Sequence, residues 1–141
     1  MALNRLEQLY RQVIVDAAAA PHVWGDVAGT APLHAVNPSC GDKLDLQVLF
    51  DDGDVAVGIA VPTTGCTISQ ASGALMIRAI AGKSRAEIGV LADSFIAMIR
   101  DGVQPAKGLG DAAALASVHA FPARVKCALL PWTTLKQKLD A

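Results

Sequence analysis

The sequence lacks the features that mark membrane-spanning, secreted and nucleic-acid-binding proteins. Its longest uninterrupted apolar run covers residues 55–62, far short of the ~18 residues that a membrane-spanning helix needs. Residues 1–12 contain three charged side chains where a secretory signal would have a long apolar segment. The formal net charge is −1 without any block of like charges, so neither nucleic acid nor an anionic membrane is an expected partner. We therefore expect a cytoplasmic protein that binds proteins or small ions.

Cysteine is also scarce in this chain. Cys40, Cys66 and Cys127 form an odd, widely spaced set, which argues against a disulfide framework. The 141 residues are 52% hydrophobic and 18% charged, enough to bury a hydrophobic core without covalent links. We expect residues 1–141 to form one domain with reduced thiols.

Several catalytic motifs are missing. The letters "AGKS" at residues 81–84 resemble the end of a phosphate-binding loop, but Ile77 stands where that motif needs glycine. The serine nucleophile motif G-x-S-x-G, the zinc deaminase signature and any C-x-x-C pair are absent. His119 lies eight residues before Cys127, so a catalytic pair is conceivable, but "SVHAFP" is more typical of a surface or capping histidine. We interpret His22 and His34 in the same way.

The hydrophobic periodicity predicts a helix, then a small sheet, then several helices. Apolar residues at helical spacing predict a first helix over residues 6–17 that ends before Pro21, and residues 21–32 are predicted as a loop. Two alternating stretches, 44–50 and 55–61, flank "DDGD" and predict a hairpin. Residues 33–37 are predicted as a third short strand.

The second half of the chain has the periodicity of helices. Helices are expected over residues 68–79, with Gly82 at the C-terminal cap, and over residues 88–99. A loop then leads to a short helical turn from Asp111. Because Pro131 interrupts the last helix, we expect a kink there or a start just after Cys127. The fold class is therefore α+β, a small antiparallel three-stranded sheet with helices packed on one face.

The three cysteines and one carboxylate fall at positions suited to metal binding. Cys40 and Asp42 are two residues apart, so both side chains can point the same way, and Gly41 between them permits a sharp bend. Cys66 directly precedes a predicted helix, whose free N–H groups favour thiolate over thiol. Cys127 lies near two positive side chains of the same segment, Arg124 and Lys126. If folding brings them together, three thiolates and one carboxylate can form a tetrahedral zinc site. The alternative is that each cysteine is a small buried hydrophobic residue.

Four ordered motifs carry a resemblance to a known family. They are "NPSCGD" around Cys40, "GCTISQAS" around Cys66, "LGD" at residues 109–111 and "FPARVKCALLPW" around Cys127. With the opening "LEQLYRQVIVD", they resemble the SufU branch of the IscU/NifU-like family of iron–sulfur cluster assembly proteins over nearly the entire chain. Many IscU-side members have histidine directly before the third cysteine, where this chain has Lys126, and its loop after the first helix, "AAAAPHVWG", also departs from the family pattern.

The resemblance implies a zinc-dependent sulfur acceptor that works with a PLP-containing, SufS-like cysteine desulfurase and with downstream Suf assembly proteins. Carried over by position, Cys40, Asp42, Cys66 and Cys127 would bind zinc, and Cys40 would accept persulfide sulfur. We hypothesise that the docked desulfurase supplies a replacement ligand, a histidine, which releases Cys40 as a free thiolate. Arg124 would pair with Asp42 or with the persulfide, or else form an ordinary surface salt bridge.

Two alternatives stay open at this stage. The same residues can hold a [2Fe–2S] cluster as an assembly scaffold, since thiolates with one oxygen donor also bind iron. The chain can also be a metal-free structural or adaptor domain with three inert buried thiols.

Overall fold

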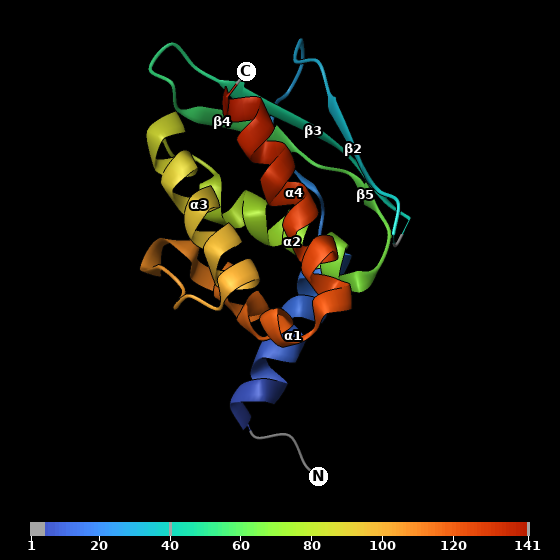
Figure 1. Ribbon diagram of the computed structural model, residues 1–141. Helices are drawn as coiled ribbons and strands as arrows, with labels where there is room; N and C mark the ends of the chain where they lie inside the picture. The colour runs from blue at the N-terminus through green and yellow to red at the C-terminus, as the bar shows by residue number, and fades with distance from the viewer. Residues whose placement is uncertain (1–4, 40, 141) are drawn as a thin grey trace.

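Helices cover one face of a β-sheet in this molecule, and the other face carries no helix (Figure 1). The computed structural model describes residues 5–39 and 41–140. The helices are α1 (Arg5–Ala19), α2 (Thr67–Ile80), α3 (Arg85–Asp101), the 3₁₀ helix η1 (Lys107–Ala120) and α4 (Pro122–Asp140). The strands are β1 (Val23–Gly25), β2 (Leu33–Asn37), β3 (Asp42–Phe50), β4 (Ala56–Ala60) and β5 (Thr63–Thr64). The predicted α+β arrangement is confirmed.

The sheet is antiparallel throughout, in the order β1-β4-β3-β2, with β5 paired to β3. Its centre is the predicted hairpin of β3 and β4. The Asp51 carboxylate fixes the turn because it accepts hydrogen bonds from the N–H groups of Gly53 (2.9 Å) and Val55 (3.0 Å). The predicted strand at 33–37 is β2, which pairs with β3 over its whole length.

The described residues form five strands, so the expected three-stranded sheet was too small. Val23–Gly25, predicted as loop, is β1, and Thr63–Thr64 is β5. Strands of three and two residues are too short to show an alternating pattern. Each exists because it pairs with a longer strand elsewhere in the sequence. β1 pairs with β4, and β5 pairs with β3.

Local signals place most helix ends. The first helix ends at Ala19, ahead of Pro21 as predicted. In α3 the Ser84 hydroxyl accepts from the Glu87 N–H (3.2 Å), and the Glu87 carboxylate accepts from the Ser84 N–H (3.1 Å), a complete capping box. The predicted helix after Cys66 is α2, with Gly82 directly after its C-cap residue.

The last two helical elements are longer than the sequence predicts. Residues 107–120 form η1, in which Gly110 has non-helical backbone angles (φ 55°, ψ −130°) and separates two helical segments. The second segment starts at Asp111 as predicted, but it is longer than a single turn, and residues 107–109 are helical where a loop was expected. Of the two expectations for the last helix, the start just after Cys127 is wrong, because α4 begins at Pro122 and includes both Cys127 and Pro131. The kink at Pro131 stays a prediction. Proline is well tolerated at a first helical position. Pro131 lacks the N–H that would otherwise bond to the Cys127 carbonyl, yet packing keeps the helix running on both sides of it.

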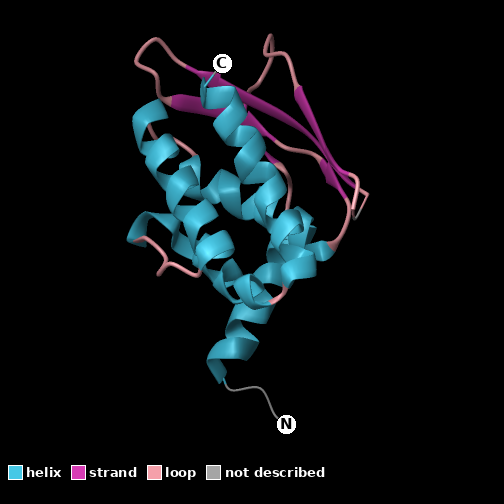
Figure 2. Cartoon of the chain, in the orientation of Figure 1, coloured by secondary structure: helices cyan, strands magenta, loops and turns pink. Residues whose placement is uncertain are grey.

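The core lies between the helical layer and the sheet, and α2 runs through its middle. Ten of the 14 residues of α2 are buried. Phe95 of α3 stacks on Trp132 of α4, with ring centroids 4.3 Å apart, and the Ser72 hydroxyl donates to the Ala128 carbonyl at 2.6 Å. Figure 2 shows all the helices gathered on one side of the strands. Among the described residues, every helix is too short or too polar to cross a membrane.

Candidate metal centre

Asp42, Cys66 and Cys127 meet at one end of the sheet. One ligand atom from each lies within 4.8 Å of the other two. Asp42 is the first residue of β3, Cys66 is the N-cap of α2, and Cys127 lies in the second turn of α4. Within residues 5–39 and 41–140, this is the one group of three or more histidine, cysteine or acidic side chains that could hold a metal ion.

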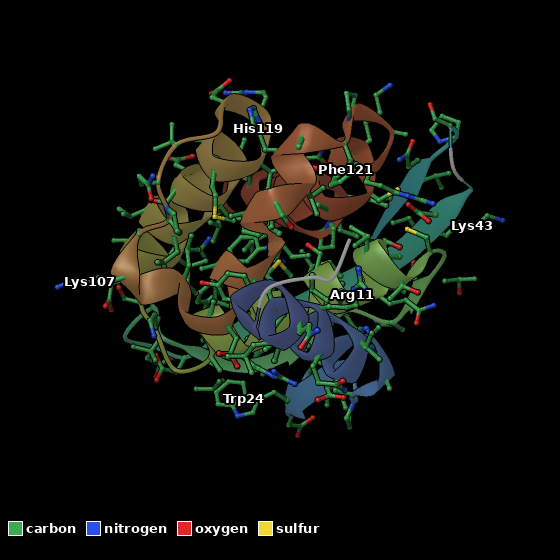
Figure 3. All side chains as sticks on the ribbon, turned by 90° about the horizontal axis from the view of Figure 1, so that it is seen from below. Arg11, Trp24, Lys43, Lys107, His119 and Phe121 are labelled. Atoms are coloured by element: carbon green, nitrogen blue, oxygen red, sulfur yellow. The ribbon has the colours of Figure 1, made fainter. Side chains whose placement is uncertain are left out.

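The Asp42 carboxylate is completely buried. Strand alternation turns it inward, while its neighbour Lys43 points away from the body of the molecule (Figure 3). Its Oδ1 accepts a hydrogen bond from the Cys66 N–H at 3.0 Å. Its Oδ2 is buried without a hydrogen-bond partner among the described residues. Since an unpaired buried carboxylate oxygen is costly, this atom has the free coordination site that a cation needs.

A glycine allows the approach between Asp42 and the start of α2. A Cβ atom at Gly65 would collide with the Asp42 carboxylate and lie 2.9 Å from the Ser69 hydroxyl oxygen. The backbone φ of Gly65 is also +155°. The missing side chain therefore lets the chain before α2 pass directly over the carboxylate.

The environment of Cys66 favours its thiolate. Burial raises the pKa of the Cys66 thiol, but the N–H and hydroxyl of Ser69 and the thiol of Cys127 outweigh this effect, and the net pKa is lowered against the repulsion from Asp42. The sequence predicted a thiolate here from the helix start alone. The deprotonated form is the metal-binding form of cysteine.

Cys127 brings the second sulfur from a helix packed against α2. Its side chain is completely buried, and its Sγ lies 4.0 Å from the Ala123 carbonyl. The hydrogen bond from Ser72 to the neighbouring Ala128 carbonyl ties this turn of α4 to α2. The two sulfurs are thus held by two helices in contact.

Two other predicted site residues do not belong to this group of three. Cys40 lies outside the described residues. Next to it, Gly41 has a φ of +71°, and its N–H donates to the Asn37 carbonyl at 2.8 Å, so the bend expected before Asp42 is present. Arg124 is exposed in the first turn of α4, and the ion pairs between described residues do not include it. The pairing of Arg124 with Asp42 stays a prediction.

The three histidines have other partners. His119 is exposed, as predicted, and its Nδ1 lies 3.0 Å from the Ile99 carbonyl (Figure 3). His22 Nε2 lies 2.8 Å from the Gln70 carbonyl, and His34 pairs with Asp45 across two strands. The sequence reasoning missed Gly65 and Ser69, although Ser69 stands three residues after Cys66, on the same side of a helix.

The family model described as the NifU-like N terminal domain matches residues 9–128. The chain belongs to the family of NifU-like N-terminal domains. Within this family, the iron-sulfur cluster assembly scaffold protein IscU of Streptococcus pyogenes serotype M1 is 43% identical over 140 residues, covering 99% of this chain and 87% of the relative. The zinc-dependent sulfurtransferase SufU of Bacillus subtilis is 36% identical over 139 residues, with 97% and 94% covered.

A solved structure of the NifU-like family has the same fold. It is described as a candidate iron-sulfur cluster assembly scaffold for the SUF system from Fervidobacterium islandicum, and it superposes with a TM-score of 0.83 at 33% identity. The match covers 94% of this chain and 98% of the solved chain. The family resemblance inferred from the four motifs is confirmed. The similarity of this chain to assembly proteins of the IscU and SufU type is confirmed as well.

The donor set suits a soft or borderline metal ion. Two thiolates and one carboxylate oxygen are ligands for zinc and also for iron in clusters, whereas calcium and magnesium prefer oxygen alone. Asp42, Cys66 and Cys127 can therefore hold a metal ion of this class, and the Oδ2 of Asp42, which has no hydrogen-bond partner in the described part of the chain, fits that use.

Proposed function

We propose that this protein accepts sulfur onto Cys40 from a PLP-dependent, SufS-like cysteine desulfurase during iron–sulfur cluster assembly. Asp42, Cys66 and Cys127, together with Cys40, would hold a zinc ion. The observation that carries the proposal is the group of two sulfurs and one carboxylate, in which Asp42 and Cys127 are buried and one carboxylate oxygen has no partner among the described residues. Residues 1–141 would act as one domain, in the cytoplasm, where thiols stay reduced.

Zinc is favoured by the number and kind of ligands. The group of three side chains lacks one ligand for the four that zinc takes in closed sites, and Cys40 stands two residues before Asp42. The similar Bacillus subtilis protein is named a zinc-dependent sulfurtransferase. When bound, zinc would keep its thiolate ligands deprotonated near neutral pH.

The sulfur transfer is an exchange between thiolate and persulfide. The Cys40 thiolate attacks the outer sulfur of the persulfide on the desulfurase. A sulfur–sulfur bond forms on Cys40, the sulfur–sulfur bond on the donor breaks, and the donor cysteine leaves as a thiolate. The docked desulfurase would supply a histidine that takes the place of Cys40 as a ligand. The left-handed turn at Gly41 separates Cys40 from the strand that holds Asp42, so Cys40 can leave without moving β3.

The second candidate function is a scaffold that holds a [2Fe–2S] cluster on the same residues. It is favoured by the 43% identity with the Streptococcus pyogenes protein, which is named an assembly scaffold. Elemental analysis separates the two functions. One equivalent of zinc in a colourless protein supports sulfur acceptance, while iron and a brown colour support a scaffold.

Replacing the acceptor cysteine tests the proposal directly. Cys40→Ala should abolish radiolabelled sulfur on this protein after incubation with the desulfurase and labelled cysteine, because no other thiol is expected to leave the metal. The wild type, treated in parallel, should be labelled, and the label should be released by a reductant. Retained labelling of Cys40→Ala would move the acceptor to another residue. Full reaction of all three thiols with a thiol reagent, with or without chelator, would favour the metal-free adaptor.

A further inference from the structure

Ser69 is a polar residue at the metal centre that the proposed function does not use. It lies in the first turn of α2, three residues after Cys66, and its side chain is completely buried. The hydroxyl donates to the Cys66 carbonyl at 3.0 Å, and the Cys66 Sγ lies 3.7 Å from the same oxygen, with the thiol as donor. One hydroxyl therefore contacts both the backbone and the sulfur of a candidate ligand.

A metal-bound Cys66 changes what this hydroxyl can do. A cysteine that ligates a metal is a thiolate, so its sulfur has no proton to donate to Ser69 and can only accept. The hydroxyl carries a single hydrogen, which is directed to the Cys66 carbonyl in this structure. To bond to the thiolate, it has to turn from the carbonyl to the sulfur.

The Cys66 carbonyl does not lose all its partners when the hydroxyl turns. It also accepts the regular helical hydrogen bond from the Gln70 N–H at 3.1 Å. Releasing the hydroxyl therefore leaves no unsatisfied carbonyl, while the thiolate gains a charge-assisted hydrogen bond. Because Ser69 is fully buried, we expect no water molecule to form this hydrogen bond in place of the hydroxyl.

We propose that Ser69 is a positioning residue of the metal centre, whose hydroxyl turns to the Cys66 sulfur when metal is bound and fixes that ligand. The inference rests on the proposed metal site and adds a residue beyond the four ligands. Partners of this kind hold a ligand in the orientation that binds the metal, and their loss commonly weakens metal binding by about 10–100-fold.

The test compares Ser69→Ala with Ser72→Ala in the full chain. Ser72 is equally buried on the same helix, and its hydroxyl bonds to the Ala128 carbonyl, next to Cys127. Both variants lose one buried hydroxyl, but only Ser69→Ala loses one that contacts a ligand sulfur. Zinc affinity is measured by competition with a chromogenic chelator, and the cobalt-substituted proteins are compared by absorption spectroscopy.

Ser69→Ala should bind zinc about 10-fold more weakly, and its sulfur-to-cobalt charge-transfer band should move to longer wavelength because the sulfur keeps more electron density. Ser72→Ala should keep the wild-type band and lose less zinc affinity than Ser69→Ala, because its hydroxyl holds α4 against α2 but contacts no ligand sulfur. An unchanged Ser69→Ala, or equal losses in both variants without a band shift, would overturn the role of Ser69 and leave the metal site standing. Failure of the wild type to bind zinc or cobalt would instead overturn the metal site itself.

Discussion

At the scale of single residues, Asp42 is a buried carboxylate whose second oxygen is suited to a cation. The Cys66 N–H bonds to its Oδ1, and its Oδ2 has no partner among the described residues. In the metal-free protein this oxygen costs free energy, because burial removes water without supplying a replacement. With metal bound, the same oxygen would become a ligand. The carboxylate would thus be unfavourable for the apoprotein and favourable for the metal-bound protein.

The effect of the variant Asp42→Asn on the melting temperature should change sign when metal is added. In chelator, the neutral amide can keep the bond from the Cys66 N–H and removes the buried charge, so the melting temperature should equal or exceed that of wild type. With zinc, the variant should melt below wild type, because it lacks one ligand and metal binding couples to folding. Thermal unfolding with and without zinc measures both. A variant that melts below wild type by the same amount in both conditions would show that Asp42 is only a structural residue.

Local signals made most of the fold predictable at the scale of elements, but not all of it. The hairpin around "DDGD" and the helix over residues 88–99, which is part of α3, were predicted because turn residues and the apolar period lie within a dozen positions of each other. β1 and β5 were missed because these short segments are strands only through their hydrogen bonds to β4 and β3, which the local sequence does not reveal. The start of α4 was missed because Pro131 suggests a break that packing overrides.

The candidate site, too, could be predicted only in part from local features of the sequence. Asp42, Cys66 and Cys127 could be named from their residue types and from the family motifs, and the structure brings these three together. The contact of Gly65 with Asp42 and the hydroxyl of Ser69 could not be derived, since they depend on how β3 lies against the start of α2. Asp42 and Cys66 are 24 positions apart in the sequence.

The capping box of α3 gives a prediction that depends on pH. The N–H and hydroxyl of Ser84 lower the pKa of Glu87 from its ordinary value of 4.5, so its carboxylate is better accommodated in the folded protein than in the unfolded chain. The stabilisation is present above pH 4.5 and is lost as the pH falls through the lowered pKa. Glu87→Gln should therefore be less stable than wild type at neutral pH, with the gap closing in acid. Urea unfolding at a series of pH values measures it, and a gap that is constant with pH would contradict the assignment.

At the scale of the whole molecule, the candidate metal centre joins elements that are distant in the sequence at one end of the sheet. β3 carries Asp42 at one end, and its other end, at Phe50, leads into the hairpin turn, near the bridge between Val55 and Ser84. At about 3.4 Å per residue, the nine residues of this strand separate the two ends by roughly 27 Å. A metal ion would therefore stabilise one end directly and the other only through the core.

Removing zinc should therefore loosen the molecule unevenly. Hydrogen exchange followed by mass spectrometry should show faster exchange in chelator for peptides that contain Asp42, Cys66 and Cys127, because their local openings no longer release a bound ion. The turn at residues 51–55 should exchange at the same rate in both states, since its hydrogen bonds come from Asp51 and do not involve the site. Asp42→Asn provides the matched control, because chelator should alter its exchange much less. Equal acceleration at both ends of β3 would mean that the ion supports global rather than local stability, and no change anywhere would remove the ion from these three side chains.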